Sequence, residues 1–533
     1  MTRTILLAVP VLALASLSTT AASADAQDQE LSLGKDVYDR WCAGCHGVDG
    51  AGAGPGAATM LPRPRDFTRA QYQVRTTGTG ELPTDADIMH VIDVGMPGTA
   101  MPGWEDALSR DEREALVAYL KSFSRFFESG PEPTPLEFGS APSSSEATIT
   151  EGARLYQEIE CWQCHGQAGR GDGSAAATLD DDLGFPNYAA DLTRNWLFNG
   201  GGAVEDIYRV LRTGLDGTPM PTFSDLIESD IVTDDQLWSL AHYVRSLSPA
   251  RAPAVREVIT ATLDESELPS TPDDERWASV QPFYVPLAGQ VIVKPRWFSP
   301  RVTNIWVRAL HDGEDVVLLV SWTDPTQSPS SDPDWASFAQ RVVDTMEPKD
   351  EGSTWEPGAP DRLVVQFPQT LPSGLERPHF LQGDARRPAY LWSWSSEEDR
   401  AVEMVAEGLA TGQQQPDENQ QLSAVSTWSE GEWRVLFRRP LMTPDIAADL
   451  QLPLATAVPI AFQAWDGDNG EAGKQNAVST WYFLALEEAT PATVFMAPVA
   501  AFVLTAAFGL GVVARAQRRY TEAEERAGQA GGA

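Results

Sequence analysis

The sequence predicts a multidomain protein with two small all-α domains, one β-sandwich domain and one C-terminal transmembrane helix. Three features predict this architecture. A Cys-x-x-Cys-His motif occurs twice, each time among apolar residues at helical spacing. Residues 275–488 contain short apolar runs rich in β-branched and aromatic residues, which is typical of strands. Residues 490–514 carry no charged side chain, and at ~1.5 Å per helical residue they can cross a hydrocarbon core of ~30 Å.

The N-terminal segment, residues 1–26, has the pattern of a secretory signal peptide. Arg3 precedes an apolar stretch at residues 5–17, and small residues follow at 22–24. An apolar stretch of this length is short for a membrane span. We therefore expect this segment to direct export, so that the bulk of the protein faces the periplasm.

The two motifs use all four cysteines of the chain: Cys42 and Cys45 with His46 in the first, and Cys161 and Cys164 with His165 in the second. Two thiols three positions apart can each form a thioether with a haem vinyl group, and the adjacent histidine then reaches the iron as proximal ligand. A zinc site would need a second pair of ligands, and a thioredoxin-type pair does not need the histidine. The motifs therefore predict two haem c groups and electron-transfer chemistry.

A methionine follows each motif at the same distance. His46 and Met101 are 55 positions apart, and His165 and Met220 are separated by the same 55. An internal repeat is therefore present. Met96 is a second methionine in the first copy, but it falls opposite a leucine in the other copy. We expect Met101 and Met220 as the sixth ligands, an arrangement that raises the haem potential and closes the iron to substrates.

Both repeats resemble class I cytochrome c. A Gly-x-x-x-Tyr pattern precedes each motif, and an amphipathic helix closes each domain. The resemblance covers residues 30–126 and 148–249 and implies a small helical fold around each haem. It also suggests that Arg65 and Arg194 face haem propionates, with a solvated surface position as the alternative.

Segments rich in proline and serine separate the folded parts. Residues 127–147 are expected to link the two helical domains, and residues 250–274 to link the second of them to the β domain. Such semi-rigid linkers would hold the haem domains near one another without fusing them into one core.

The β domain is predicted to be one sandwich over residues 275–488. Its expected strands are residues 316–322, 362–367, 389–394, 433–437 and 460–465. Motifs such as Ser-Trp-Thr-Asp-Pro-Thr at 321–326, Gln-Gly-Asp at 382–384 and Ala-Trp-Asp-Gly at 464–467 resemble the haem-binding γ subunits of the ethylbenzene dehydrogenase and dimethylsulfide dehydrogenase group. The resemblance implies an electron-transfer subunit of an extracytoplasmic molybdoenzyme.

The same resemblance implies one haem b, held between a methionine and a lysine. Lys474 is the candidate lysine, whereas Gln382 stands where the methionine is expected. A solvated Lys474 is the alternative, and a domain without haem would then serve for docking or scaffolding. The other candidate ligands in the domain are Met346, Met404, Met442, His311 and His379.

Charge patterns at the C-terminus and along the whole chain indicate its surroundings. Two glutamates directly precede the uncharged segment 490–514 and three arginines follow it, so we expect a single membrane span with residues 515–533 in the cytoplasm. The chain has 76 acidic residues against 39 Lys and Arg, which gives a net charge of −37 and excludes nucleic acid binding. Such a charge favours a positively charged redox partner at low salt.

Together these features favour a membrane-anchored dihaem electron-transfer subunit of a molybdoenzyme complex, of the nitrate reductase or nitrite oxidoreductase type. The expected partners are a molybdopterin catalytic subunit, an iron–sulfur subunit, and a quinone-linked or soluble redox carrier. No catalytic residue is assigned, because the chain has no molybdopterin-scale domain and no cysteines for iron–sulfur clusters. Two alternatives stay open: a cytochrome tethered to a carbohydrate-binding sandwich, and a stand-alone dihaem enzyme such as a peroxidase.

Overall fold

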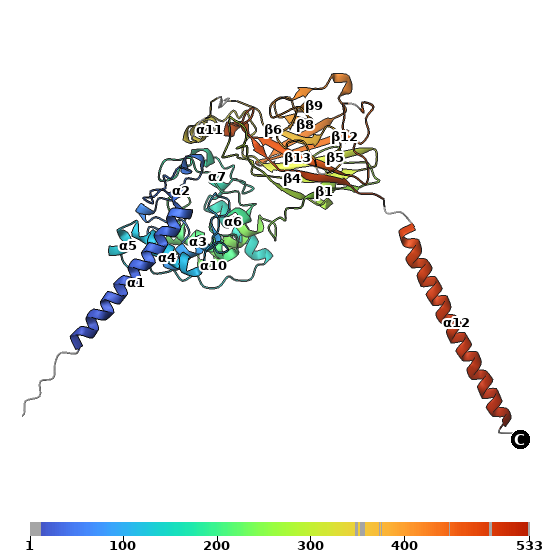
Figure 1. Ribbon diagram of the computed structural model, residues 1–533, viewed down its shortest axis with the longest axis horizontal. Coiled ribbons are helices and arrows are strands. Elements are labelled where there is room, and N and C mark those ends of the chain that lie inside the picture. Colours follow the sequence, from blue (N-terminus) through green and yellow to red (C-terminus); the bar gives the residue numbers. More distant parts are fainter. Residues whose placement is uncertain are drawn as a thin grey trace, which may run out of the picture.

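The computed structural model describes residues 12–346, 350–351, 358–372, 374, 376–446, 448–489 and 493–530. Figure 1 shows a helical region that contains both domains expected to bind haem, called the haem domains below. A β domain lies beside it, and two long helices, α1 and α12, extend away from the body of the molecule. The expected fold class is confirmed: the chain has a helical region, a large β-sheet domain and a C-terminal apolar helix.

The two haem domains contain a closely similar succession of elements. The first has α1 (Leu12–Trp41), α2 (Ala43–His46), η1 (Ala57–Thr59), η2 (Phe67–Arg69), α3 (Asp85–Val94), α4 (Arg110–Ser122) and α5 (Phe126–Ser129). The second has α6 (Glu146–Glu158), α7 (Trp162–His165), η3 (Ala176–Thr178), η4 (Asn195–Leu197), α8 (Val204–Thr213), α9 (Ser224–Glu228) and α10 (Asp234–Ser246). In each domain the first helix packs against the closing helix, α1 against α4 and α6 against α10.

Reciprocal hydrogen bonds between side chains and backbone fix where several of these helices begin. Thr84 and Asp87 cap α3, because each side chain accepts a hydrogen bond from the backbone N–H of the other. Ser109 and Glu112 cap α4 in the same way, and Thr233 accepts from the third residue of α10. The helix boundaries therefore follow from local sequence.

One glycine in each haem domain allows the first and last helices to cross at close range. A Cβ atom added at Gly34 would lie 2.1 Å from the carbonyl oxygen of Ala115, and one added at Gly152 would lie 2.1 Å from that of Ser239. Real Cβ atoms do not approach an oxygen this closely, so any other residue would push the helices apart. The Gly-x-x-x-Tyr pattern thus encodes a packing contact.

The β domain forms one continuous hydrogen-bonded path, in the order β10-β9-β8-β6-β13-β15-β1-β4-β5-β12-β11, which folds over into two layers. Its strands are β1 (Val258–Leu263), β2 (Phe283–Pro286), β3 (Ala288–Gly289), β4 (Asn304–His311), β5 (Asp315–Thr323), β6 (Arg362–Pro368), β7 (Gly383–Asp384), β8 (Arg387–Ser395), β9 (Arg400–Ala406), β10 (Gln413–Gln414), β11 (Ser423–Ser429), β12 (Glu432–Pro440), β13 (Ala457–Trp465), β14 (Ala477–Val478) and β15 (Tyr482–Leu486). All five strands expected from the sequence lie within β5, β6, β8, β12 and β13. The helical elements of this part are η5 (Glu275–Ser279), α11 (Pro333–Thr345), η6 (Asp417–Asn419) and η7 (Gly467–Asn469).

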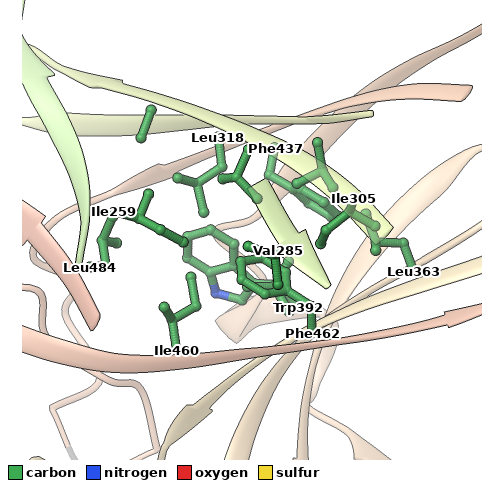
Figure 2. Packing of buried hydrophobic residues seen from close by; sticks show 14 of the residues in the cluster. Ile259, Val285, Ile305, Leu318, Leu363, Trp392, Phe437, Ile460, Phe462 and Leu484 are labelled. Atoms are coloured by element: carbon green, nitrogen blue, oxygen red, sulfur yellow. The ribbon is translucent and has the colours of Figure 1, made fainter. Parts of the chain in front are cut away.

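The hydrophobic core of the β domain lies between the two layers. Figure 2 shows Trp392 of β8 among side chains that come from both, including Leu318 of β5, Phe437 of β12 and Phe462 of β13. All four side chains are fully buried. Burial of each such side chain contributes about 1.5–3 kcal/mol, so this core stabilises the pairing of the layers.

The segment 250–274, expected as a linker, is instead part of the sheet. Its residues 258–263 form β1, which pairs in parallel with β15 on one side and with β4 on the other. The prolines at both ends of the segment obscured a short β-branched run between them. Because its partners come from distant parts of the chain, the pairing has no local sequence signal.

The linker 127–147 is attached to both haem domains along its length. Leu136 donates its N–H to the carbonyl of Thr76 in the first domain at 2.8 Å. Phe138 packs edge-on against Tyr208 of the second domain. His242 is buried in α10, and its Nε2 lies 2.8 Å from the carbonyl oxygen of Pro142 in this segment. The segment is therefore packed against both haem domains and is not a free linker. The two haem domains also contact one another directly.

The helices at the two ends lie where the sequence places apolar segments. Helix α12 (Thr493–Ala530) has an apolar stretch long enough to cross a membrane, none of it buried against the rest of the protein. It begins within the predicted span 490–514, whose first three residues lie outside the described part, and continues through most of the predicted tail. Helix α1 joins residues 12–26 of the predicted signal peptide to the first helix of the haem domain.

The helix crossings predict the effect of one added methyl group. Gly34→Ala should lower the free energy of unfolding of the first haem domain by about 1–3 kcal/mol, because the new Cβ meets a backbone carbonyl. Circular dichroism during thermal unfolding measures this. Gly44→Ala is the matched control, since a Cβ there meets nothing within 4 Å. Equal unfolding midpoints for the two variants would contradict the packing argument.

Candidate haem sites and the junctions around them

Both candidate proximal histidines are held by the same backbone contact. His46 Nδ1 lies 3.0 Å from the carbonyl oxygen of Arg65, and His165 Nδ1 lies 2.9 Å from that of Ala190. A carbonyl can only accept, so Nδ1 carries the proton and Nε2 keeps its lone pair for a metal. Burial lowers the pKa of both histidines, which favours the neutral imidazole that iron requires.

The candidate methionine ligands lie in two loops with matching hydrogen bonds. Thr99 Oγ1 accepts from the N–H of Met101 at 3.1 Å, and Thr218 Oγ1 accepts from that of Met220 at 3.2 Å. The backbone N–H of Met96 donates to the carbonyl of Met101. In the second copy the backbone N–H of Leu215, the residue that corresponds to Met96, donates to the carbonyl of Met220. Met96 and Leu215 therefore occupy equivalent places in the loop, as the repeat predicts, and the two loops present Met101 and Met220 alike.

The four thiols complete two equivalent donor sets. Cys42, Cys45, Cys161 and Cys164 are unpaired and partly buried. Burial raises the pKa of Cys42 and Cys161 to about 12, so neither is a reactive thiolate of the thioredoxin type. Each set offers two thiols, one imidazole with a free Nε2 and one thioether. These residues fit a covalently bound haem c.

The two haem domains are joined at the ligand loop of the second. Arg75 of the first domain is fully buried and pairs with Asp216 at 2.8 Å. It also donates to the carbonyl of Thr213 at 2.8 Å, the last residue of α8. Asp216 accepts from Thr79 and Gly80 as well. Residues 213–216 lead directly into Met220, so the first domain fixes the loop that carries the second methionine.

The second haem domain is also joined to the β domain. Asp191, which follows the Ala190 carbonyl that holds His165, accepts a hydrogen bond from Thr323 at the end of β5. Tyr188 donates to Asn469 of η7 at 2.8 Å. The second candidate haem site is therefore clamped between the first haem domain and the sandwich.

The arginines expected at haem propionates have different surroundings. Arg194 pairs with Asp191 at 2.7 Å and donates to Asn304 of the β domain, so its guanidinium belongs to the junction with the sandwich. Arg65 forms no ion pair with any described residue and lies between the two haem domains, where the carboxylates of Asp181 and Asp182 act on its charge. Its side chain is half-buried.

A buried acidic cluster lies next to the junction with the sandwich. Asp324, Asp361 and Asp466 are almost fully buried, and each has a side-chain oxygen within 4.8 Å of those of the others. Glu471, also buried, accepts from Asn469. Burial raises the pKa of Asp466 to about 7 and of Glu471 to about 8. Two of the aspartates lie in motifs that carry the family resemblance, but sequence alone did not show that the three meet.

The residues expected around a haem b do not fit that group. Gln382 is buried, donates to Gln463 at 2.9 Å and accepts from the N–H of Ala410 at 3.0 Å. Gln463 in turn donates to Gln366 and accepts from Asn476, so the amides form a connected network. The side chain at this position is thus an amide and not a thioether, and both its nitrogen and its oxygen form hydrogen bonds. The network reaches the segment of Lys474, which is itself only partly buried.

The other candidate ligands of the sandwich differ in their surroundings. The Nδ1 of His311 is buried without a hydrogen-bond partner among the described residues. The Nε2 of His311 lies 2.9 Å from the carbonyl oxygen of Glu487, and His379 Nδ1 accepts from Leu381. Met442 is 61% exposed, which leaves it without a pocket around its sulfur. Met404 packs in a small apolar cluster on the outer face of one layer. Met346 is buried directly after α11.

The junction of the haem domains predicts the effect of removing one charge. Asp216→Asn should destabilise the docked pair by about 3–5 kcal/mol, because Arg75 would stay buried without its partner. Thermal unfolding and the rate of cleavage by a glutamate-specific protease at the glutamates of residues 127–147 measure this. Glu114→Gln is the control, since its pair with Arg110 is exposed and should contribute nothing measurable. An unchanged cleavage rate in Asp216→Asn would contradict the argument that the Arg75–Asp216 pair holds the two haem domains together.

The acidic cluster predicts that stability depends on pH. Its carboxyl groups have a higher pKa in the folded protein than the ordinary value near 3.9, so folding takes up protons. The resulting stabilisation is full below about pH 4 and is lost as the pH rises through about 7 to 8. The unfolding temperature of the sandwich, measured with a chelator present, should therefore fall between about pH 5 and pH 8. Asp466→Asn should flatten this slope, and a rise in stability over that range would contradict the account.

The family matches cover the same domains that the structure shows. The cytochrome c family matches residues 31–124 and 149–248, and a family described as ethylbenzene dehydrogenase matches residues 274–421. The chlorate reductase subunit gamma of Ideonella dechloratans is 31% identical over 23% of this chain and 49% of its own length. The subunit CcoP of a cbb3-type cytochrome c oxidase from Azospirillum brasilense is 26% identical over 40% of this chain and 61% of its own length.

The chain thus spans about half to three fifths of the length of these curated relatives. Among solved structures, a chain of the reducing HAO-like protein complex of Kuenenia stuttgartiensis is 43% identical over 41% of this chain and 96% of its own length, with a TM-score of 0.39. A family 9 carbohydrate-binding module from Caldicellulosiruptor kristjanssonii is 11% identical over 44% of this chain and 97% of its own, with a TM-score of 0.24. From the family matches and the geometry, the chain consists of two cytochrome c domains, which bind haem c, followed by a domain of the ethylbenzene dehydrogenase γ-subunit type.

Proposed function

We propose that this protein is a membrane-anchored dihaem subunit that carries electrons for an extracytoplasmic molybdoenzyme complex, of the nitrate reductase or nitrite oxidoreductase type. One observation carries the proposal. Two equivalent sets of thiols, histidine and methionine lie in domains that pack on one another through a ligand loop. A carrier needs two such sites held at fixed separation, and this arrangement provides them.

Each haem c would supply a one-electron couple in a site that this chain closes on both sides. Cys42 and Cys45 would hold the first haem covalently, and His46 and Met101 would ligate its iron. Cys161, Cys164, His165 and Met220 would do the same for the second. The backbone bonds at the histidines and the threonine bonds at the methionines keep both donor sets in place. Little rearrangement is then needed when the charge of the site changes.

The β domain would dock the protein onto an iron–sulfur subunit beside a molybdopterin catalytic subunit. The likeness to a chlorate reductase subunit gamma supports this partner class. The amide network around Gln382 supports a sandwich without haem b, so the two c haems form the whole electron path in this chain. The second domain, which contacts the sandwich, would exchange electrons with the complex, and the first domain with a carrier.

The first domain has an exposed apolar face that suits such a carrier. Trp41 is 42% exposed directly before Cys42, and it packs against Trp104, near the ligand loop. Val94, at the end of α3, is 50% exposed. The residue equivalent to Val94 in the second domain, Thr213, is covered by Arg75. Only the first domain thus leaves this position open for a quinone-linked or soluble redox carrier.

Anchoring would come from α12, whose apolar stretch is exposed over its whole length. The arginines after it would stay in the cytoplasm, so both haem domains and the sandwich would lie on the periplasmic side. The predicted signal peptide, residues 1–26, is consistent with that orientation.

Two alternatives are separable by experiment. A stand-alone peroxidase would need an open iron position, which a methionine at each site opposes. A carbohydrate-binding sandwich would need exposed aromatic platforms, but the large tryptophans of this domain, such as Trp322, Trp392 and Trp394, are buried in its core.

The test is purification of the full-length protein from native membranes in mild detergent. Pyridine haemochrome spectra before and after acid–acetone extraction should give two covalent haems per chain and no extractable haem. Molybdenum and iron–sulfur subunits should copurify. Extractable haem at one per chain would contradict the haem-free sandwich. Purification as a single subunit that turns over peroxide would contradict the electron-transfer role.

A further inference from the structure

A small cavity lies between the two haem domains, with a volume of about 30 Å³. Its wall comes from residues 62–73 of the first domain and from residues 181–187 and Gly217 of the second. Gly217 lies three positions before Met220. The cavity is therefore bounded by the segment that holds the first histidine and by the loop that carries the second methionine.

Arg65 takes part in both candidate haem sites. Its carbonyl oxygen lies 3.0 Å from His46 Nδ1 and orients that ring. Its guanidinium lies against the other domain, because a Cβ atom added at Gly217 would be 2.7 Å from Arg65 Nη1. The backbone of this one residue thus serves the first site, while its side chain contacts the ligand loop of the second.

The charge of Arg65 is poorly compensated compared with the other arginines at these junctions. Arg75 pairs with Asp216 and Arg194 pairs with Asp191, whereas Arg65 forms no ion pair within the described part of the chain. The charges that face it are Arg69 from its own domain and Asp181 and Asp182 from the other.

Both acidic neighbours of Arg65 accept hydrogen bonds from groups other than Arg65. The carboxylate of Asp182 accepts from Gln71 at 2.9 Å, and Asp181 Oδ1 accepts from the backbone N–H groups of Leu183 and Phe185. The guanidinium of Arg65 therefore lies in a half-buried place between the two sites, with carboxylates that face it but form no ion pair with it. Electrostatic interactions there are stronger than in water.

We propose that Arg65 is a positioning residue shared by the two haem sites: its carbonyl orients His46, and its guanidinium supports the Met220 loop and places a positive charge between the haems. The proposal rests on the proposed haem binding. Reduction adds one negative charge to each site, and a nearby positive charge favours the reduced state. A side chain of the first domain therefore raises the potential of the second.

The test is a spectroelectrochemical titration of the full-length protein carrying Arg65→Gln. Both haem potentials should fall by about 59 mV, which corresponds to a tenfold change in the equilibrium constant of a one-electron reduction. Arg65→Lys should retain most of both potentials. Arg69→Gln is the matched control, since Arg69 is exposed on the rim of the same cavity and should be screened by salt. Met101→His and Met220→His assign the two steps, because each lowers one potential selectively.

A second variant shifts the potentials in the opposite direction. Asp182→Asn keeps a partner for Gln71 but removes a negative charge that faces Arg65, so both potentials should rise. This variant keeps the proposal testable if Arg65→Gln fails to incorporate haem. A shift confined to the first haem would overturn the shared role, and unchanged potentials in Asp182→Asn and Arg65→Gln would overturn the proposal altogether. Haem content, measured first, separates these outcomes from failure of the proposed function, which would give a wild-type protein without two haems.

Discussion

The buried contact between Arg75 and the ligand loop of the second haem domain constrains the rest of the structure. It ties residues 213–216 to the first domain, and those residues lead into Met220. On its other side the second domain is held by the sandwich through Asp191 and Tyr188. The second candidate haem therefore lies in the middle of the molecule, and the relative placement of all three domains follows from contacts made next to its ligands.

The residues of the two candidate haem sites were assigned from the sequence alone, and their role as haem ligands stays a prediction. The motifs, the 55-residue spacing and the equivalence of Met96 with Leu215 depend on local order along the chain, and the loop hydrogen bonds agree with them. The strands with long apolar runs were predictable for the same reason. β1 was missed because its pairing is parallel and distant in sequence. The docking of Arg75, the position of Arg194 and the meeting of three aspartates were missed because they arise only when domains pack.

The sandwich combines a family fold with a changed interior at the position of Gln382. An amide there is held by Gln463 and by the N–H of Ala410, and these bonds need no cofactor. A buried polar network of this kind is stable when each member is satisfied, and it fixes the loops around it. Under the proposed function, the domain would serve for docking while the electron path ran through the two covalently bound haems. The buried carboxylates near the junction add a dependence on pH that a purely apolar interface would lack.

The most direct test of a docked pair of haem domains is the distance between the two ferric irons, measured by pulsed electron paramagnetic resonance on the oxidised full-length protein. Domains clamped at the ligand loop should give one narrow distance distribution that does not change with detergent or salt. A broad distribution, as expected for two domains on a flexible linker, would contradict the account.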